Sequence, residues 1–60
     1  STQSGNWGTP ATWGFGGNPT PVAGVNYPGA TDTATIAAGH TVTVAVSQAA
    51  DGVTVNGTGF

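Results

Sequence analysis

The sequence lacks cysteine, methionine, leucine, lysine and arginine altogether among its 60 residues. Without cysteine no disulfide can hold the chain, and the only side chains with real metal-binding character, Asp32, Asp51 and His40, are too few for a zinc site and a thin set for calcium. A domain of this size buries only about 60% of the surface that its unfolded chain exposes. We therefore expect no cofactor and no metal, and we expect stability to come from association with copies of itself or with further β-structure.

The absence of cationic side chains excludes whole classes of partner. Nucleic-acid binding depends on lysine and arginine side chains that neutralise phosphates, and attraction to anionic membranes depends on the same residues. No apolar run approaches the roughly 18 residues that span a bilayer. We therefore predict a protein that binds no nucleic acid and does not insert into membranes.

The missing methionine bears on where the protein resides. A chain without an initiator residue is expected to be processed at its N-terminus or cut from a longer protein. The first four residues, Ser-Thr-Gln-Ser, fit a start left by removal of a signal peptide. Together with the composition, this predicts a secreted protein, extracellular or on the cell surface.

The residues that are present are small and β-branched, with seven valines, nine alanines and 11 glycines. From Asp32 onward, apolar and polar residues alternate with a period of two, which is typical of strands. We expect strands within 33–36, 41–46 and 53–55, and the stretch 47–50 is too short to form a helix by itself. The side chains predicted to face inward are Ile36, Val42, Val44, Val46, Val53 and Val55.

The first half of the chain has a different texture. Residues 1–31 carry all four prolines and most of the aromatic side chains. Disordered segments are poor in aromatics, so we interpret this half as an ordered, irregular lid on a single β domain whose strand-rich part is 32–60. The residues predicted to cover the core or to form assembly contacts are Trp7, Trp13, Phe15, Tyr27 and Phe60.

A weak internal repeat suggests how the strands are arranged. Residues 32–36, Asp-Thr-Ala-Thr-Ile, are echoed nineteen positions later by residues 51–55, Asp-Gly-Val-Thr-Val. Nineteen residues is the size of one coil of a β-solenoid, in which successive coils stack and pair. The predicted fold is therefore all-β, with short β-solenoid or β-helix-like coils, and a small β-sandwich is the alternative.

Four sequence strings carry a family resemblance: Gly5-Asn6-Trp7, then Pro-Ala-Thr-Trp-Gly at 10–14, then residues 27–36, then Ala-Gly-His-Thr-Val-Thr-Val at 38–44. Over residues 5–57 the chain resembles the N-terminal segment of secreted right-handed parallel β-helix proteins, including adhesin-like proteins and the related domain named for its eight glycines. The resemblance implies that the tryptophans cap the end of a solenoid whose first coils are built by residues 33–57.

The residues that could carry chemistry are few. His40 with one of the two aspartates and a serine would be needed for a hydrolytic triad, but no nucleophile elbow or oxyanion motif accompanies them. We expect His40 to be a turn residue and each aspartate to accept hydrogen bonds from nearby backbone amides in a turn. We therefore predict that the protein is not an enzyme. Asn56-Gly57-Thr58 matches the N-glycosylation sequon.

The function predicted from these features is that of an extracellular structural subunit that assembles with copies of itself into a fibre or surface appendage, through β-edge and lid contacts. The alternative is a carbohydrate-binding or adhesin module of a larger exported protein. In that alternative Trp7, Trp13 and Tyr27 form a stacking platform for sugar rings, and a polysaccharide is the partner.

Overall fold

The computed structural model describes all residues, 1–60, and contains short strands and one short 3-10 helix. In chain order the elements are β1 (Gly5–Asn6), η1 (Pro10–Trp13), β2 (Thr33–Ile36), β3 (Val42–Thr43) and β4 (Gly52–Val55). There is no α-helix, and no helix has the length and apolarity needed to cross a membrane. The expected class of short strands without α-helix is confirmed.

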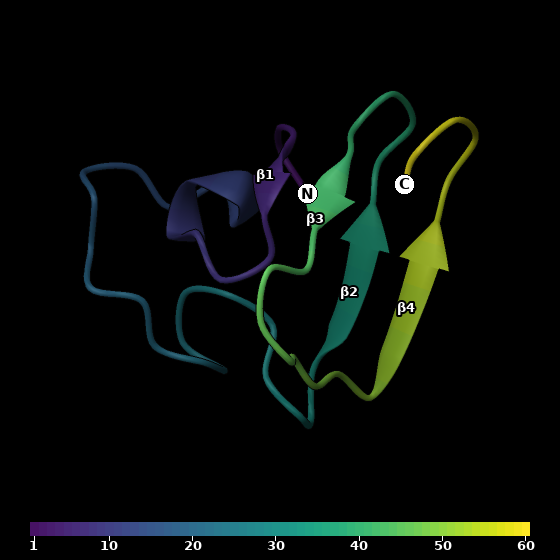
Figure 1. Ribbon diagram of the computed structural model, residues 1–60. Coiled ribbons are helices and arrows are strands. Elements are labelled where there is room, and N and C mark those ends of the chain that lie inside the picture. Colours follow the sequence, from purple (N-terminus) through teal and green to yellow (C-terminus); the bar gives the residue numbers. More distant parts are fainter.

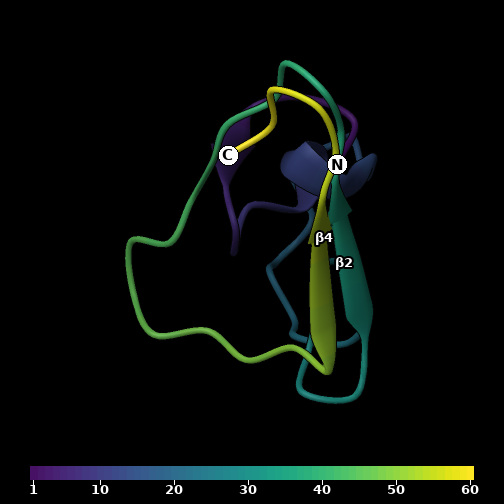
Figure 2. The same cartoon turned by 90° about the vertical axis from the view of Figure 1, so that its right-hand side faces the viewer.

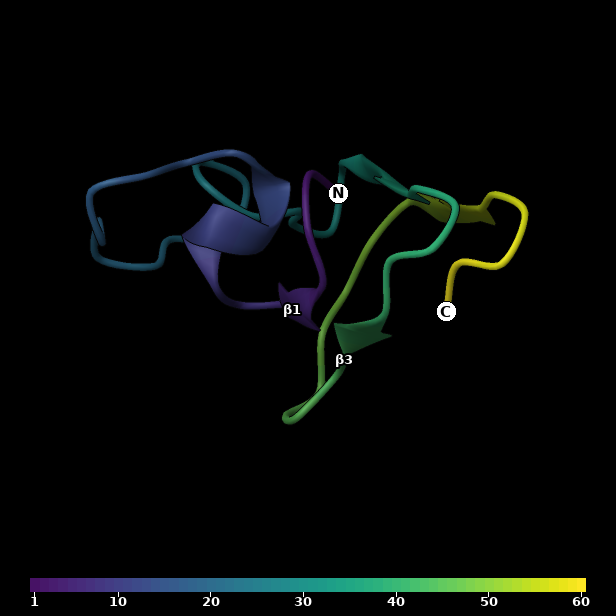
Figure 3. The same ribbon diagram turned by 90° about the horizontal axis from the view of Figure 1, so that it is seen from above.

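The strands form two parallel pairs, β1 with β3 and β2 with β4 (Figure 1). In the longer pair Thr33 lies opposite Gly52 and Ile36 lies opposite Val55. Each partner is nineteen positions further along the chain, so the repeat seen in the sequence is the pairing register of β2 and β4. Between them the chain turns a corner, runs through β3 and returns by the loop 44–51, making one circuit (Figure 3).

The parallel course of the two segments continues beyond β2 and β4. His40 N–H donates to Ala37 O at 3.1 Å, and nineteen positions later Gly59 N–H donates to Asn56 O at 2.9 Å, so the same turn follows both strands. After the turn, Phe60 N–H donates to His40 O at 2.9 Å. Residues 51–60 therefore run alongside residues 32–42 with one constant offset.

The two equivalent turns both require glycine, at different positions. Gly39 has φ +81° at the third position of its turn, whereas Gly57 has φ +52° at the second position of the other. Positive φ at one central residue is compatible with a tight turn and favours glycine, because a Cβ atom is strained there. The repeat therefore conserves the hydrogen bond of the turn but not its backbone type.

The N-terminal segment occupies the other side of the first circuit. Gly5 N–H donates to Thr41 O at 3.0 Å and Trp7 N–H donates to Thr43 O at 2.8 Å. The Ser1 backbone nitrogen donates to Thr35 O. Residues 35–43 are thus flanked by residues 1–7 on one side, and residues 32–42 are flanked by residues 51–60 on the other.

The lid is ordered by turns and by η1. Pro10 starts η1, where its fixed φ suits a first helical position, and Gly14 ends it with φ +96°. Farther along, buried Asn26 accepts from Val22 N–H at 2.8 Å and donates to Thr20 O at 2.9 Å. These contacts satisfy backbone groups that an irregular segment otherwise leaves to water.

The buried apolar core is very small, consisting of Trp7, Ala34 and Ile36. Alternate residues of β2 are buried, as the alternation predicts, with Ile36 only 5% exposed. Of the other side chains predicted to face inward, Val42 is partly buried. The remaining four, also predicted to face inward, are exposed in the single chain: Val44, Val46, Val53 and Val55.

The exposure of these four valines has two causes. Strand β3 ends at Thr43, so Val44 and Val46 lie in the return loop instead of in a strand reaching 46. Val53 and Val55 are in β4 and share a face with Ala34 and Ile36, because register partners in a parallel pair lie on the same side of the sheet. They are exposed because no further layer covers them.

Candidate functional site

The first candidate site is the set of uncovered valines of β4 and of the loop that leads to it, which we call the open end. Its members are Val44, Val46, Val53 and Val55, of which Val44 and Val53 line one hollow. Phe60 is exposed as well. Val53 is 53% exposed and Val55 is 49% exposed, although both lie on the same face as the buried side chains of β2. The open end is therefore the continuation of the core face, left without a cover.

The open end is hollowed beside β4. A cavity of about 210 Å³ opens here. The buried Trp7 ring lines it from the lid side, and small or aliphatic side chains complete the wall, together with the polar side chain of Gln48. The lining residues are Trp7, Val44, Gln48, Ala49, Ala50 and Val53.

The backbone of β4 also has an unpaired edge. Asn56 N–H donates to Ile36 O at 2.9 Å, and neighbouring residues of a strand point their backbone groups to opposite sides. The N–H and C=O groups of Val53 and Val55 therefore point away from β2, where no strand pairs with them. Figure 1 shows β4 as the outermost strand beyond β2, and Figure 2, seen from that side, shows the two strands next to each other.

The N-terminal segment covers the opposite side of the molecule. Ser1 occupies part of the free edge of β2, since its backbone nitrogen donates to Thr35 O and its Oγ accepts from Ala37 N–H at 3.0 Å. Beyond β1, Thr2 N–H donates to Thr12 O at 2.8 Å, and Thr12 Oγ1 packs against Gly5. The molecule has one capped end and one open end.

A second exposed apolar surface lies on the lid, formed by Phe15, Val22 and Val25, which we call the lid patch. The lid and β4 lie on opposite sides of the molecule, at the left and right of Figure 1, and the view from above agrees. Phe15 and Val25 line one hollow of the molecule and Val44 and Val53 line another, so the two apolar surfaces are separate.

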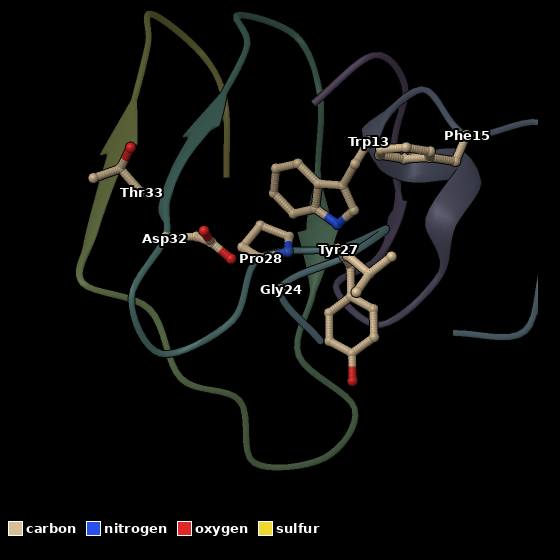
Figure 4. Close-up of a pocket in the computed structure, with 8 residues that line it drawn as sticks. Trp13, Phe15, Gly24, Tyr27, Pro28, Asp32 and Thr33 are labelled. Atoms are coloured by element: carbon tan, nitrogen blue, oxygen red, sulfur yellow. The ribbon is translucent and has the colours of Figure 1, made fainter. Parts of the chain in front are cut away.

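An open hollow of about 250 Å³ lies between the lid and the entrance to β2, and its lining residues are drawn in Figure 4. The rings of Trp13, Phe15 and Tyr27 lie around it, and the Asp32 carboxylate comes from the entrance to β2. Asp32 Oδ2 accepts from Gly29 N–H at 2.8 Å, so this carboxylate holds a turn of the lid. The hollow combines aromatic faces with one acidic group and no cation.

The two tryptophans hold the lid together. Their rings meet edge to face, 5.3 Å apart with an interplanar angle of 73°. Trp13 Nε1–H donates to Trp7 O at 2.7 Å, and Trp7 Nε1–H donates to Pro28 O at 3.2 Å. Trp7 is thus part of the core, as predicted for a lid residue, and its buried ring offers no platform for a sugar.

His40 lies at the corner after β2, with its Nδ1 2.8 Å from Ser1 Oγ. A serine and the histidine thus come together, but Asp32 bonds to its own turn and Asp51 is exposed at the entrance to β4. No group of three or more His, Cys, Asp or Glu side chains gathers in the structure. The turn positions expected for His40 and for the Asp32 carboxylate are confirmed.

Sequence reasoning missed two buried polar residues of the lid. Thr12 is fully buried, and its Oγ1 has no hydrogen-bond partner. Asn26 provides the paired lid contacts described above. An asparagine within a Gly/Pro-rich turn region is the signal that could have found Asn26, because its amide satisfies nearby backbone groups. Asn56 of the sequon is exposed just after β4.

Comparison with protein-family models, with curated proteins and with solved structures gives no match for this chain. The resemblance to secreted β-helix proteins therefore stays a prediction.

Proposed function

We propose that the chain is an extracellular structural subunit, a short β-solenoid that assembles with copies of itself into a fibre through its open end and its lid patch. The observation that carries this proposal is the pair of uncovered apolar surfaces on opposite sides of one small molecule. A subunit with two such surfaces can join a neighbour on each side, and contacts that do not close produce a filament.

The estimated free energies are consistent with association that depends on protein concentration. Fully burying an exposed valine contributes about 1.5–3 kcal/mol, so four half-exposed valines contribute about 3–6 kcal/mol per copy, or about 6–12 kcal/mol for two copies. Association costs about 4–15 kcal/mol in lost rigid-body freedom. The open end alone is marginal, and the unpaired edge of β4 and the lid patch supply the rest.

The low charge of the chain supports self-association. The formal net charge is −2, with no lysine or arginine. Electrostatic repulsion between two copies is therefore small. Apart from pairs that involve His40, no side-chain ion pair can form between them. We expect assembly to depend weakly on sodium chloride and to be promoted by sulfate, which strengthens apolar association.

Sedimentation velocity over a range of concentrations, with electron microscopy of the most concentrated sample, tests the proposal. We expect filaments for the unchanged chain, and we expect the double variant Val53→Thr and Val55→Thr to assemble much less, because threonine keeps strand propensity while adding a hydroxyl. The control Thr54→Val changes the same strand on its other face and should still assemble. Monomers at all concentrations would refute the proposal.

The aromatic hollow favours a second candidate function, the binding of a neutral polysaccharide. Aromatic faces stack on sugar rings, and the Asp32 carboxylate accepts hydrogen bonds from hydroxyl groups, whereas the lack of cations disfavours acidic sugars. Phe15, 46% exposed, is the residue to replace, since Trp13 supports the lid. A polysaccharide pull-down that is equal for Phe15→Ala and the unchanged chain would exclude this site.

A further inference from the structure

The proposed assembly needs a geometry, and the edges of the strands restrict it. A second copy can extend the β2–β4 sheet only where backbone groups are free. On the outer edge of β2, Ser1 bonds to Thr35 O and to Ala37 N–H and blocks that part of the edge for a further strand, and η1 packs beyond β1. No segment of the chain lies along the outer edge of β4, which is therefore the edge that we pair with its equivalent in another copy.

We infer that two copies join by pairing β4 with β4 in antiparallel orientation about a two-fold axis, an inference that rests on the proposed self-assembly. A contact between identical patches is isologous, and two identical edge strands related by a two-fold axis perpendicular to their sheet run antiparallel and keep their equivalent side chains on one face. The sheet then continues as β2–β4–β4–β2 across the two molecules.

The register of the β4–β4 pair follows from which backbone groups of β4 are free. The free N–H and C=O groups belong to Val53 and Val55, as derived above from the Asn56 hydrogen bond. They are all used when Val53 pairs with Val55 of the second copy and Val55 with Val53. The axis then passes between the two copies of Thr54, which form a non-hydrogen-bonded pair with Cα atoms about 4.5 Å apart.

Side chains and charges agree with this register. Val53 of one copy and Val55 of the other lie on one face as cross-strand neighbours, so their side chains contact each other beside the hollow at Trp7. The two Asp51 carboxylates stand three residues on either side of the axis, about 20 Å apart along the strands. A parallel arrangement would place them side by side at about 5 Å, where like charges repel.

The geometry has a consequence for the fibre. Each β4 edge can pair with only one other copy, so a fibre also needs contacts between lid patches. The two kinds of contact must alternate along the fibre. The resulting fibre has no polarity, and its repeating unit is a pair of chains.

Single-cysteine variants test this geometry, because the native chain has no cysteine. Thr54→Cys should form a disulfide-linked pair under mild oxidation, since a Cα separation of about 4.5 Å suits a disulfide. The control Thr35→Cys is exposed on the same face of the sheet, but its copies would lie about three strand spacings apart, roughly 14 Å, and should not link. We expect Thr54→Cys to link at least about ten times faster.

A second pair of variants tests the backbone edge. Val53→Pro removes an N–H that points outward and spares the β2 ladder, so it should weaken association at least about ten-fold while the chain still folds. Thr54→Pro removes an N–H that bonds to β2 and should unfold the strand.

The outcomes separate the two proposals. Filaments in which Thr54→Cys links no faster than Thr35→Cys would overturn the two-fold geometry and leave the proposed function standing. A chain that stays monomeric at every concentration would overturn both.

Discussion

The substitution Ile36→Val measures how much the small core contributes to the stability of the chain. Ile36 is 5% exposed at the end of β2, and only two other apolar residues are as well buried, so the loss of one methylene cannot be shared among many contacts. Such a change typically costs about 0.5–1.5 kcal/mol. A chain of this size has a total stability of about 3–9 kcal/mol, so a sizeable fraction is at stake.

The assay is thermal unfolding followed by tryptophan fluorescence, since Trp7 is buried and reports loss of the core. For a domain of 60–100 residues, 1 kcal/mol shifts Tm by about 4–8 °C, so Ile36→Val should lower Tm by about 2–12 °C at every protein concentration. The matched control is Val55→Ala, which changes the register partner of Ile36 on the same face.

The control should behave differently because Val55 is half exposed in the single chain. In dilute solution we expect Val55→Ala to lower stability by less than about 1 kcal/mol, whereas at high concentration it should weaken assembly. A result in which Ile36→Val is neutral, while Val55→Ala destabilises the dilute chain, would show that the buried and open faces have been exchanged.

Three further predictions concern the lid. Gly29→Ala should destabilise the fold by about 1–3 kcal/mol, because the Cβ of the alanine would lie 2.8 Å from Gly24 N. The control Gly16→Ala should be neutral, since its Cβ would have nothing within 4 Å. Equal effects of the two substitutions in urea titration would contradict the close packing of Gly29. Thr12→Val should raise stability by about 1–3 kcal/mol, since it removes a buried hydroxyl without a partner; a lower Tm would show that the hydroxyl is bonded after all. Asn26→Ala should cost about 1–3 kcal/mol by leaving Val22 N–H and Thr20 O unpaired, and unchanged amide hydrogen exchange at Val22 would argue against this.

Parts of the fold were predictable because they depend on local pattern. The alternation over 33–36 identifies which side chains of β2 are buried, since strand side chains alternate between faces. The echo of residues 32–36 at 51–55 predicted the offset at which β2 and β4 pair. The lid was expected to be ordered because its aromatic residues need a core to cover, and Trp7 is indeed in that core.

Parts of the site were not predictable. Alternation continues through Val44 and Val46, yet the strand stops at Thr43 because the chain must leave it to return to β4. The meeting of Ser1 with His40, and the closure of one end by residues 1–7, depend on contacts between segments far apart in the sequence.

The sequence by itself determined which face of each strand is apolar, where the turns fall and which charges are absent, because these are properties of neighbouring residues. Only the tertiary structure decided that Ile36 is covered while its register partner Val55 is open, since a side chain is buried only when another layer is packed on it. It also placed Ser1 against the outer edge of β2 and no segment against that of β4, and edge pairing depends on which segments the folded chain brings alongside.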